Sequence, residues 1–307
     1  MEKYIKIIID SYYGYGQYLV NELLYPSWGN YLWWLIGLSL FVWLLEIFFP
    51  WRKSQPIIRK DFWLDGFYMF FNYFLFSLIA YNAISNVGVE LFDDFLDLFG
   101  LENAVAIHIE TWPRWSQLLL LFILADLIQW NVHRMLHRIP ALWEFHKLHH
   151  SVEQMGFAAH LRFHWMETII YKSVQYIPLA MIGFGLEDFF LVHIFTTSIG
   201  HLNHANIRLT YGPFKYLLNN PVMHTWHHAL HLPAQHRHGV NYGITLSVWD
   251  YLFKTAYVPN EGRDEPLGFD GMEAYPKTFL DQIAYPFWSR KKQSLPKKIS
   301  NTRKPVA

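Results

Sequence analysis

The sequence contains HRMLH at residues 133–137, HKLHH at residues 146–150 and HTWHH at residues 224–228. Histidine makes up only 17 of the 307 residues, so two copies of His-x-x-His-His are far more than chance predicts. Residues three or four positions apart lie on one face of an α-helix, where their side chains are neighbours. Each of these three histidine boxes is therefore expected to present two or three ring nitrogens from one short helical segment.

The side chains of the boxes are suited to binding transition metals. Neutral imidazole is a good ligand for iron, copper, nickel and zinc, whereas calcium and magnesium prefer oxygen. A single zinc ion needs about four ligands. The boxes offer more, enough for two octahedral ions with positions left for water, hydroxide or dioxygen. The predicted ligands are His133, His137, His146, His149, His150, His224, His227 and His228.

The boxes and their flanks resemble the fatty acid hydroxylase and sterol desaturase superfamily. The similarity includes LWEFHKLHHS at residues 142–151, NYG at residues 241–243 and WDYLF at residues 249–253. It covers about residues 115–258, and the rest of the chain shares only its hydrophobic character. The resemblance implies an integral-membrane di-iron oxygenase that holds two Fe ions, uses O2 and receives electrons from an external donor.

The resemblance also implies site residues outside the boxes. His164, in the pattern Arg-x-His-x-x-Glu, is a candidate ligand, as are His201 and His204 between the second and third boxes. Asn241 and Asp250 lie in the matching flanks. They are expected to hold the ligating histidines in position without binding the metal themselves.

Two acidic residues are predicted to orient imidazoles through their second ring nitrogen. Asp126 lies seven residues before His133, two helical turns along the same face, in an apolar segment where an acid is costly and usually partnered. Alternatively, Asp126 is a polar residue of the helix bundle that has no role at the metal site. Glu167 follows His164 by one turn and is its expected partner. The remaining histidines are not predicted to be ligands: His108 and His193 are expected to be satisfied core or interfacial residues, and His160, His231, His236 and His238 belong to loops near the site.

Composition favours a membrane protein. Hydrophobic residues make up 52%, aromatic residues 19% and charged residues only 16%, below the usual quarter for soluble domains. Cysteine is absent, which excludes disulfides, thiolate metal sites and iron–sulfur clusters within the chain. The net charge is zero, so nothing indicates a nucleic-acid partner.

The apolar segments predict an all-α membrane bundle of about four segments with a cytosolic histidine-rich helical cap. Residues 31–50, 62–85 and 116–132 are predicted spans, residues 86–103 an amphipathic surface segment, and residues 168–199 a helical hairpin that returns to the side it left. Basic residues at positions 52–53 and 59–60 follow the first span. The positive-inside tendency then places this end of the bundle, and the active site, on the cytoplasmic side.

The chain divides into four predicted parts. Residues 1–30 form an N-terminal segment in which Gly14–Gly16 is expected to be a flexible turn, and residues 31–114 form membrane spans and the amphipathic segment. Residues 115–258 form the catalytic region. Residues 259–307 form a cytosolic segment with a solvated, disordered basic tail.

Together these patterns predict an oxidoreductase that hydroxylates a C–H bond of a fatty acyl, sterol or related membrane lipid. Desaturation of the same lipids remains open, and a metal transport or storage protein and a membrane scaffold are the non-enzymatic alternatives. The sequence has no haem, flavin or dinucleotide motif, so a separate reductase, ferredoxin or cytochrome, or a pterin, is expected as donor. Lys147, Arg134 and Arg162 are candidates for docking an acidic donor.

Overall fold

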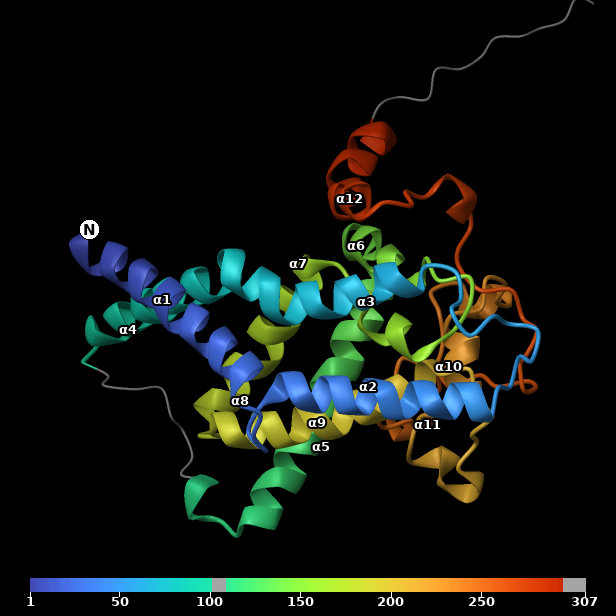
Figure 1. The fold of residues 1–307 in the computed structure, drawn as a ribbon, viewed down its shortest axis with the longest axis horizontal. Helices are drawn as coiled ribbons and strands as arrows, with labels where there is room; N and C mark the ends of the chain where they lie inside the picture. Colours follow the sequence, from blue (N-terminus) through green and yellow to red (C-terminus); the bar gives the residue numbers. More distant parts are fainter. Residues whose placement is uncertain (101–108, 295–307) are drawn as a thin grey trace, which may run out of the picture.

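The computed structural model describes residues 1–100 and 109–294, and within them every regular element is helical (Figure 1). The predicted all-α fold is therefore confirmed; pairing of extended backbone in this part of the chain is limited to isolated bridges such as Pro50 with Ile207. The α-helices are α1 (Glu2–Leu24), α2 (Tyr31–Phe48), α3 (Phe62–Phe70), α4 (Asn82–Asp97), α5 (Arg114–Arg138), α6 (Pro140–His150), α7 (Trp165–Tyr171), α8 (Ile177–Met181), α9 (Leu186–His204), α10 (Pro221–His227), α11 (Val248–Leu252) and α12 (Phe279–Ser294). Turns of π-helix occur at Phe71–Leu75, Ser77–Tyr81 and Lys172–Tyr176, and short 3-10 helices at Ile109–Thr111, Phe157–Leu161, Gly212–Tyr216, Ala234–His236 and Met272–Ala274.

Within residues 1–100 and 109–294, three helices are long and apolar enough to cross a membrane, as predicted. They are Tyr31–Phe48, Phe62–Asp97 and Arg114–Arg138. The second runs for 36 residues because α3, two π-helical turns and α4 are continuous. The predicted amphipathic segment from residue 86 is thus the far end of this helix and not a separate surface element.

Residues 165–204 form the predicted helical hairpin. One arm consists of α7, the π-helical turn Lys172–Tyr176 and α8, and the other arm is α9. Neither arm is among the helices apolar and long enough to span. The hairpin brings His164 and His204, at its two ends, back to the same end of the bundle.

The N-terminal segment differs from the prediction. Gly14 and Gly16 lie inside α1, a helix of 23 residues, so the expected flexible turn is wrong. The helix is stabilised by α4, which lies beside it (Figure 1). Lys3 Nζ and Tyr4 OH both donate to the carboxylate of Asp94, each at 2.7 Å.

The end of the bundle that carries the histidine boxes is held together by Glu46, an acidic residue in the first span. The carboxylate of Glu46 in α2 accepts hydrogen bonds from the backbone amides of Phe157 at 2.9 Å and Asn206 at 2.7 Å. The loop after α2 is attached to the same segment, because Trp51 N donates a hydrogen bond to Asn206 O at 2.9 Å. These bonds fix the segments on either side of the hairpin against the first span.

Some predictions fall outside the described residues. They concern His108 and the basic residues Lys297, Lys298, Arg303 and Lys304 of the tail.

Candidate metal centre

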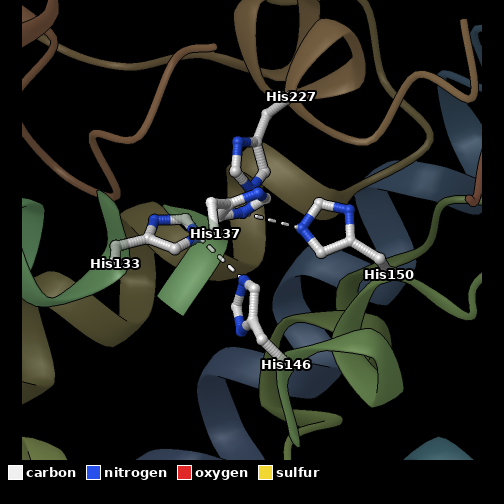
Figure 2. A group of neighbouring side chains, drawn as sticks. All are labelled: His133, His137, His146, His150 and His227. Carbon is white, nitrogen blue, oxygen red and sulfur yellow. Dashed lines mark hydrogen bonds between the residues drawn. The ribbon is translucent and has the colours of Figure 1, made fainter. Parts of the chain in front are cut away.

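Nine histidines converge as two neighbouring groups of ring nitrogens. Within each group one nitrogen from every ring lies within 4.8 Å of the others. Group A consists of His133, His137, His146, His150 and His227, and group B consists of His149, His204, His224 and His228. In Figure 2 the rings of group A point toward a common centre. The two groups adjoin, since the rings of His150 and His228 stack with centroids 4.4 Å apart.

Each His-x-x-His-His box contributes to both groups. In α6, His146 and His150 enter group A and His149 enters group B. In α10 and its C-terminal cap the division is reversed, with one ring in group A and two in group B. Residues i and i+4 point in nearly one direction, whereas i+3 lies about 60° around the helix from i. The spacing therefore divides the ligands between two adjacent positions.

Local sequence signals place these helices. Helix α5 carries His133 and His137 in its last turns, and α6 begins at once with Pro140, which is favoured in a first helical turn. Helix α10 begins after Asn220, whose side-chain oxygen accepts a hydrogen bond from Met223 N at 3.0 Å. The caps fix where each box begins and hence which way its rings face.

Five rings are oriented by a hydrogen bond from Nδ1. Carbonyl and carboxylate oxygens only accept, so in these rings the proton is on Nδ1 and the lone pair of Nε2 faces the site. The bonds are His133 to Tyr242 O at 2.7 Å, His227 to Val240 O at 2.7 Å, His204 to Gly200 O at 2.8 Å, His146 to Glu167 Oε2 at 2.8 Å and His149 to Arg162 O at 3.2 Å.

The inward nitrogens have the spacing of ligands that share an ion. The Nε2 atoms of His133 and His146 are 3.1 Å apart, and those of His149 and His204 are 3.3 Å apart. All four rings carry their proton on Nδ1, so lone pairs face each other, which is repulsive without a cation. Two adjacent octahedral ligands with bonds of about 2.1 Å lie about 3 Å apart. His227 Nε2 also has no hydrogen-bond partner among the described residues. The donor set therefore fits two transition-metal ions.

Burial keeps the imidazoles of α6 and α10 in the form that binds metal. It lowers the pKa of His146, His149 and His150 well below the usual 6.5, and the neighbouring imidazoles lower it further. The pKa of His224 and His227 is lowered for the same reasons. These rings remain neutral, and neutral imidazole is the ligand form.

A cavity leads from both groups into the helical hairpin. Its inner wall is formed by histidines of both groups, namely His133, His146, His149, His204 and His224. The rest of the lining comes from both arms of the hairpin, from α5, from the second span and from the segment that contains the 3-10 helix Phe157–Leu161. Its empty volume, including the mouth, is about 1220 Å³. The cavity thus places open space directly beside the ring nitrogens of both groups.

Comparison with known proteins agrees with this geometry. The fatty acid hydroxylase family model matches residues 118–255, which contain all three boxes. Over 226 residues the chain is 32% identical to the ornithine lipid hydroxylase of Rhizobium tropici, covering 70% of this chain and 66% of that protein. The resemblance to the fatty acid hydroxylase and sterol desaturase superfamily is thus confirmed for the region that carries the boxes.

Other members of the superfamily match shorter stretches. Human alkylglycerol monooxygenase is 31% identical over 144 residues, which are 46% of this chain and 30% of that protein. The methylsterol monooxygenase of Aspergillus fumigatus is 27% identical over 197 residues, 60% of this chain and 62% of that protein. The chain thus spans less than two thirds of the length of these relatives. No solved structure matches it.

Two candidate ligands suggested by the superfamily pattern lie outside both groups. His164 caps α7: its Nδ1 accepts from Met166 N at 3.1 Å and its Nε2 donates to Ile283 O at 2.9 Å, so both nitrogens are engaged. His201 Nε2 lies 3.1 Å from Ser39 Oγ, and its Nδ1 lies 2.9 Å from His160 Nδ1. The structure places His204 in group B. The rings of His164 and His201 belong to neither group and are bonded to other partners.

Glu167 and Asp126 differ from their expected contacts. Glu167 bonds the ring of His146 and not that of His164, from which it accepts only the backbone N–H at 3.3 Å. The carboxylate of Asp126 accepts from Trp249 Nε1 at 2.8 Å and Leu246 N at 3.3 Å. Asp126 therefore holds the segment around α11, and the expected bond to an imidazole is wrong.

Asn241 and Asp250 support the loop behind group A. Asp250 accepts from the backbone N–H of Tyr242 at 2.9 Å and of Gly243 at 2.7 Å, and Tyr242 O in turn orients His133. The side-chain amide of Asn241 donates to Met223 O at 2.9 Å, which joins this loop to α10. Asp250 thus positions His133 indirectly, because it holds the backbone of Tyr242, whose carbonyl oxygen bonds the His133 ring.

Arg162 is not available to dock a donor. Its side chain is 1% exposed, and its guanidinium pairs with Asp65 Oδ1 at 2.8 Å. It also donates to Ser151 Oγ at 2.9 Å, next to the second box. Arg162 therefore fixes the backbone whose carbonyl orients His149.

Two cavity residues were not identified as functional from sequence. His193 was expected to be satisfied, yet its Nε2 has no hydrogen-bond partner among the described residues. Lys172 lines the same cavity. A lysine in the middle of an apolar hairpin was the available signal, because an unpaired charge in such a segment is costly.

Proposed function

We propose that this protein is an O2-dependent di-iron enzyme that hydroxylates a C–H bond of a membrane lipid. The observation that carries the proposal is the pair of adjacent all-histidine groups at the inner end of a cavity between the helical hairpin, α5 and the second span. The relatives support the reaction class, since they are named as hydroxylases and monooxygenases of ornithine lipid, alkylglycerol and methylsterol.

The ligand set supports two iron ions as the resident metal. Groups A and B supply nine imidazoles, more than two tetrahedral zinc sites take up. Iron bound by neutral imidazoles would supply activation of dioxygen. The residues that would hold it are the members of groups A and B, with Glu167 and the carbonyls of Val240 and Tyr242 fixing the rings.

The protein's own part is to position the lipid and to exclude water. The cavity begins at the inward nitrogens and is bounded by the hairpin, so a lipid inserted there has one carbon near the metals. Hydroxylation is favoured over desaturation because the named reactions of the relatives above are hydroxylations or monooxygenations.

The electron donor is proposed to be a separate protein, a reductase, ferredoxin or cytochrome, or alternatively a pterin. We place the metal end on the cytoplasmic side of the membrane, where such donors are found. Support comes from Lys53 and Lys60, exposed in the loop after α2, and from the contact of this loop with Asn206 beside group B.

The test combines metal analysis with isotope-labelled oxygen. The full chain is purified with its lipids, and its iron and zinc are measured. Cells expressing the wild type or His227→Ala are then grown under isotopically heavy dioxygen, and their lipids are analysed by mass spectrometry. We expect about two iron ions per chain and a lipid that gains one heavy oxygen only with the wild type.

Each alternative predicts another result. A lipid that loses two hydrogens without gaining oxygen would indicate a desaturase. Zinc without lipid turnover, or metal that exchanges freely across the membrane, would indicate storage or transport and would overturn the proposal.

A further inference from the structure

We propose that Lys172 and His193 form a subsite, within the hairpin cavity, for the anionic headgroup of the lipid substrate. This inference rests on the proposed lipid hydroxylase function and specifies its substrate class. The ligand chemistry is a carboxylate or phosphate group carried by a lipid.

Lys172 is a cation in the cavity without an acidic partner. Its Nζ lies 4.2 Å from the centre of the Tyr81 ring, and within the described part of the chain no carboxylate forms a salt bridge with it. A cation–π contact leaves the ammonium N–H groups free for acceptors. Removing such a charge from water is costly unless it is paired, so a bound anion would remove this cost.

His193 supplies a second unpaired group in the same cavity. Its ring packs against Tyr31 and Tyr73, with centroids 5.1 Å and 5.4 Å away, and these contacts fix its orientation. Its buried Nε2 has no hydrogen-bond partner among the described residues. Lys172 is near enough to act electrostatically on His193. His193 and Lys172 thus line one cavity from the two arms of the hairpin, and neither side chain is neutralised by a partner there.

The acids that line the cavity do not neutralise Lys172. Glu167 accepts from His146 Nδ1 and His164 N, and Asp126 accepts from Trp249 Nε1 and Leu246 N. Both carboxylates are therefore used by the protein framework. Neither acid forms a salt bridge with Lys172, which is the only lysine or arginine among the described residues that line the cavity.

The position of Lys172 limits which carbon can react. It follows Glu167 by five residues on one continuous helical arm, a rise of about 7.5 Å, and Glu167 is bonded to the ring of His146. An anion at Lys172 therefore places only a short part of the lipid beside group A. The carbon presented to the metals belongs to the headgroup or its first neighbours, and the far end of an acyl chain lies elsewhere.

The experiment measures binding without turnover. Full-length protein is stripped of metal with a chelator, placed in phosphatidylcholine nanodiscs and titrated by tryptophan fluorescence. The probes share one chain length: N-palmitoylglycine carries a carboxylate, hexadecyl phosphate a phosphate, and N-palmitoylethanolamine no charge. Empty nanodiscs correct for partition into the bilayer.

We expect the wild type to bind at least one anionic probe about tenfold more tightly than the neutral probe. Lys172→Met should abolish this preference while keeping the affinity for the neutral probe, and Lys172→Arg should restore it. The matched control is Lys215→Met, because Lys215 is an exposed lysine whose ammonium lies 5.1 Å from the Tyr216 ring. It should behave as the wild type.

Other outcomes overturn the proposal. A wild type without anionic preference, or an unchanged preference in Lys172→Met, would remove the subsite. Should Lys172→Met not fold in nanodiscs, His193→Phe serves as the second variant and must weaken the anionic preference. Because metal-free protein is used, loss of the oxygenase proposal would leave the binding result standing, and the reverse also holds. Which probe binds distinguishes a carboxylate from a phosphate headgroup.

Discussion

Two histidines one turn apart on α9 have different environments. His204 Nε2 lies 2.9 Å from His224 Nε2 in group B, whereas both nitrogens of His201 face Ser39 and His160. We expect His204→Gln to lose at least half of the bound metal and His201→Gln to retain it. Elemental analysis of the two purified variants, with retained folding checked by circular dichroism, measures this. Equal metal loss in both variants would contradict the assignment of His204, but not His201, as a metal ligand.

Glu167 fixes the ring of His146 through a hydrogen bond of 2.8 Å, so a change at Glu167 is expected to weaken metal binding. Glu167→Ala removes the acceptor, and loss of such a partner typically weakens metal binding 10- to 100-fold. Glu167→Gln keeps an amide oxygen in its place, so we expect a smaller change. Competition with a coloured chelator measures the affinities, and the exposed Glu153→Ala is the control. If Glu167→Ala bound metal as the wild type does, Glu167 would have no role in orienting the ligand.

At the residue scale the sequence predicts the histidine boxes well and the hydrogen-bond partners of these histidines poorly. An i, i+3, i+4 pattern is local, so the eight box histidines could be grouped from spacing alone. The partner of Glu167 could not, because His146 lies 21 residues away and the chain reverses between them. Proximity in sequence favoured His164, whose ring instead caps α7.

The hairpin arm α9 packs tightly against the 3-10 helix Phe157–Leu161, and a glycine permits this contact. A Cβ added at Gly200 would lie 2.1 Å from His160 Nε2, whereas one at Gly37 in α2 would meet nothing within 4 Å. Alanine is favoured over glycine in a helix by about 1 kcal/mol, but overpacking costs about 1–3 kcal/mol. We expect Gly200→Ala to lower the Tm and to displace His160, and Gly37→Ala to keep or raise it.

Thermal unfolding in one detergent compares the two glycine variants. A Gly200→Ala protein as stable as Gly37→Ala would mean that α9 and the 3-10 helix are further apart than described. Metal content of Gly200→Ala is a second readout, because His204 Nδ1 donates to the Gly200 carbonyl at 2.8 Å.

At the element scale the apolar spans were predictable and their ends were not. Hydropathy detects the length of an apolar run, so the helices at Tyr31–Phe48 and Arg114–Arg138 followed from the sequence. Helix α1 was missed because its stability depends on contacts with α4 that are distant in sequence, such as the bond from Lys3 to Asp94, 91 residues later. Continuity of α3 with α4 was missed because π-helical turns carry no clear sequence signal.

At the scale of the whole molecule, the metal centre depends on several distant segments meeting at one end of the bundle. In Figure 1 helices α6 and α10 lie toward one end and α1 and α4 toward the other. The chain reaches the first end through the loop after α2, which contains Ser54, and leaves the other end near Leu98, after α4. Both positions are exposed.

The absence of cysteine makes this arrangement directly testable, since a single introduced cysteine gives the only thiol in the chain. We expect Ser54→Cys to react with a membrane-impermeant maleimide only after the membrane is opened, and Leu98→Cys to react in intact cells. The physical reason is the positive charge of Lys53 and Lys60 near Ser54, which favours retention on the cytoplasmic side. The unmodified chain is the control for background labelling. Labelling of Ser54→Cys from outside would place the histidine groups on the opposite face, out of reach of cytosolic electron donors, and would require a different donor.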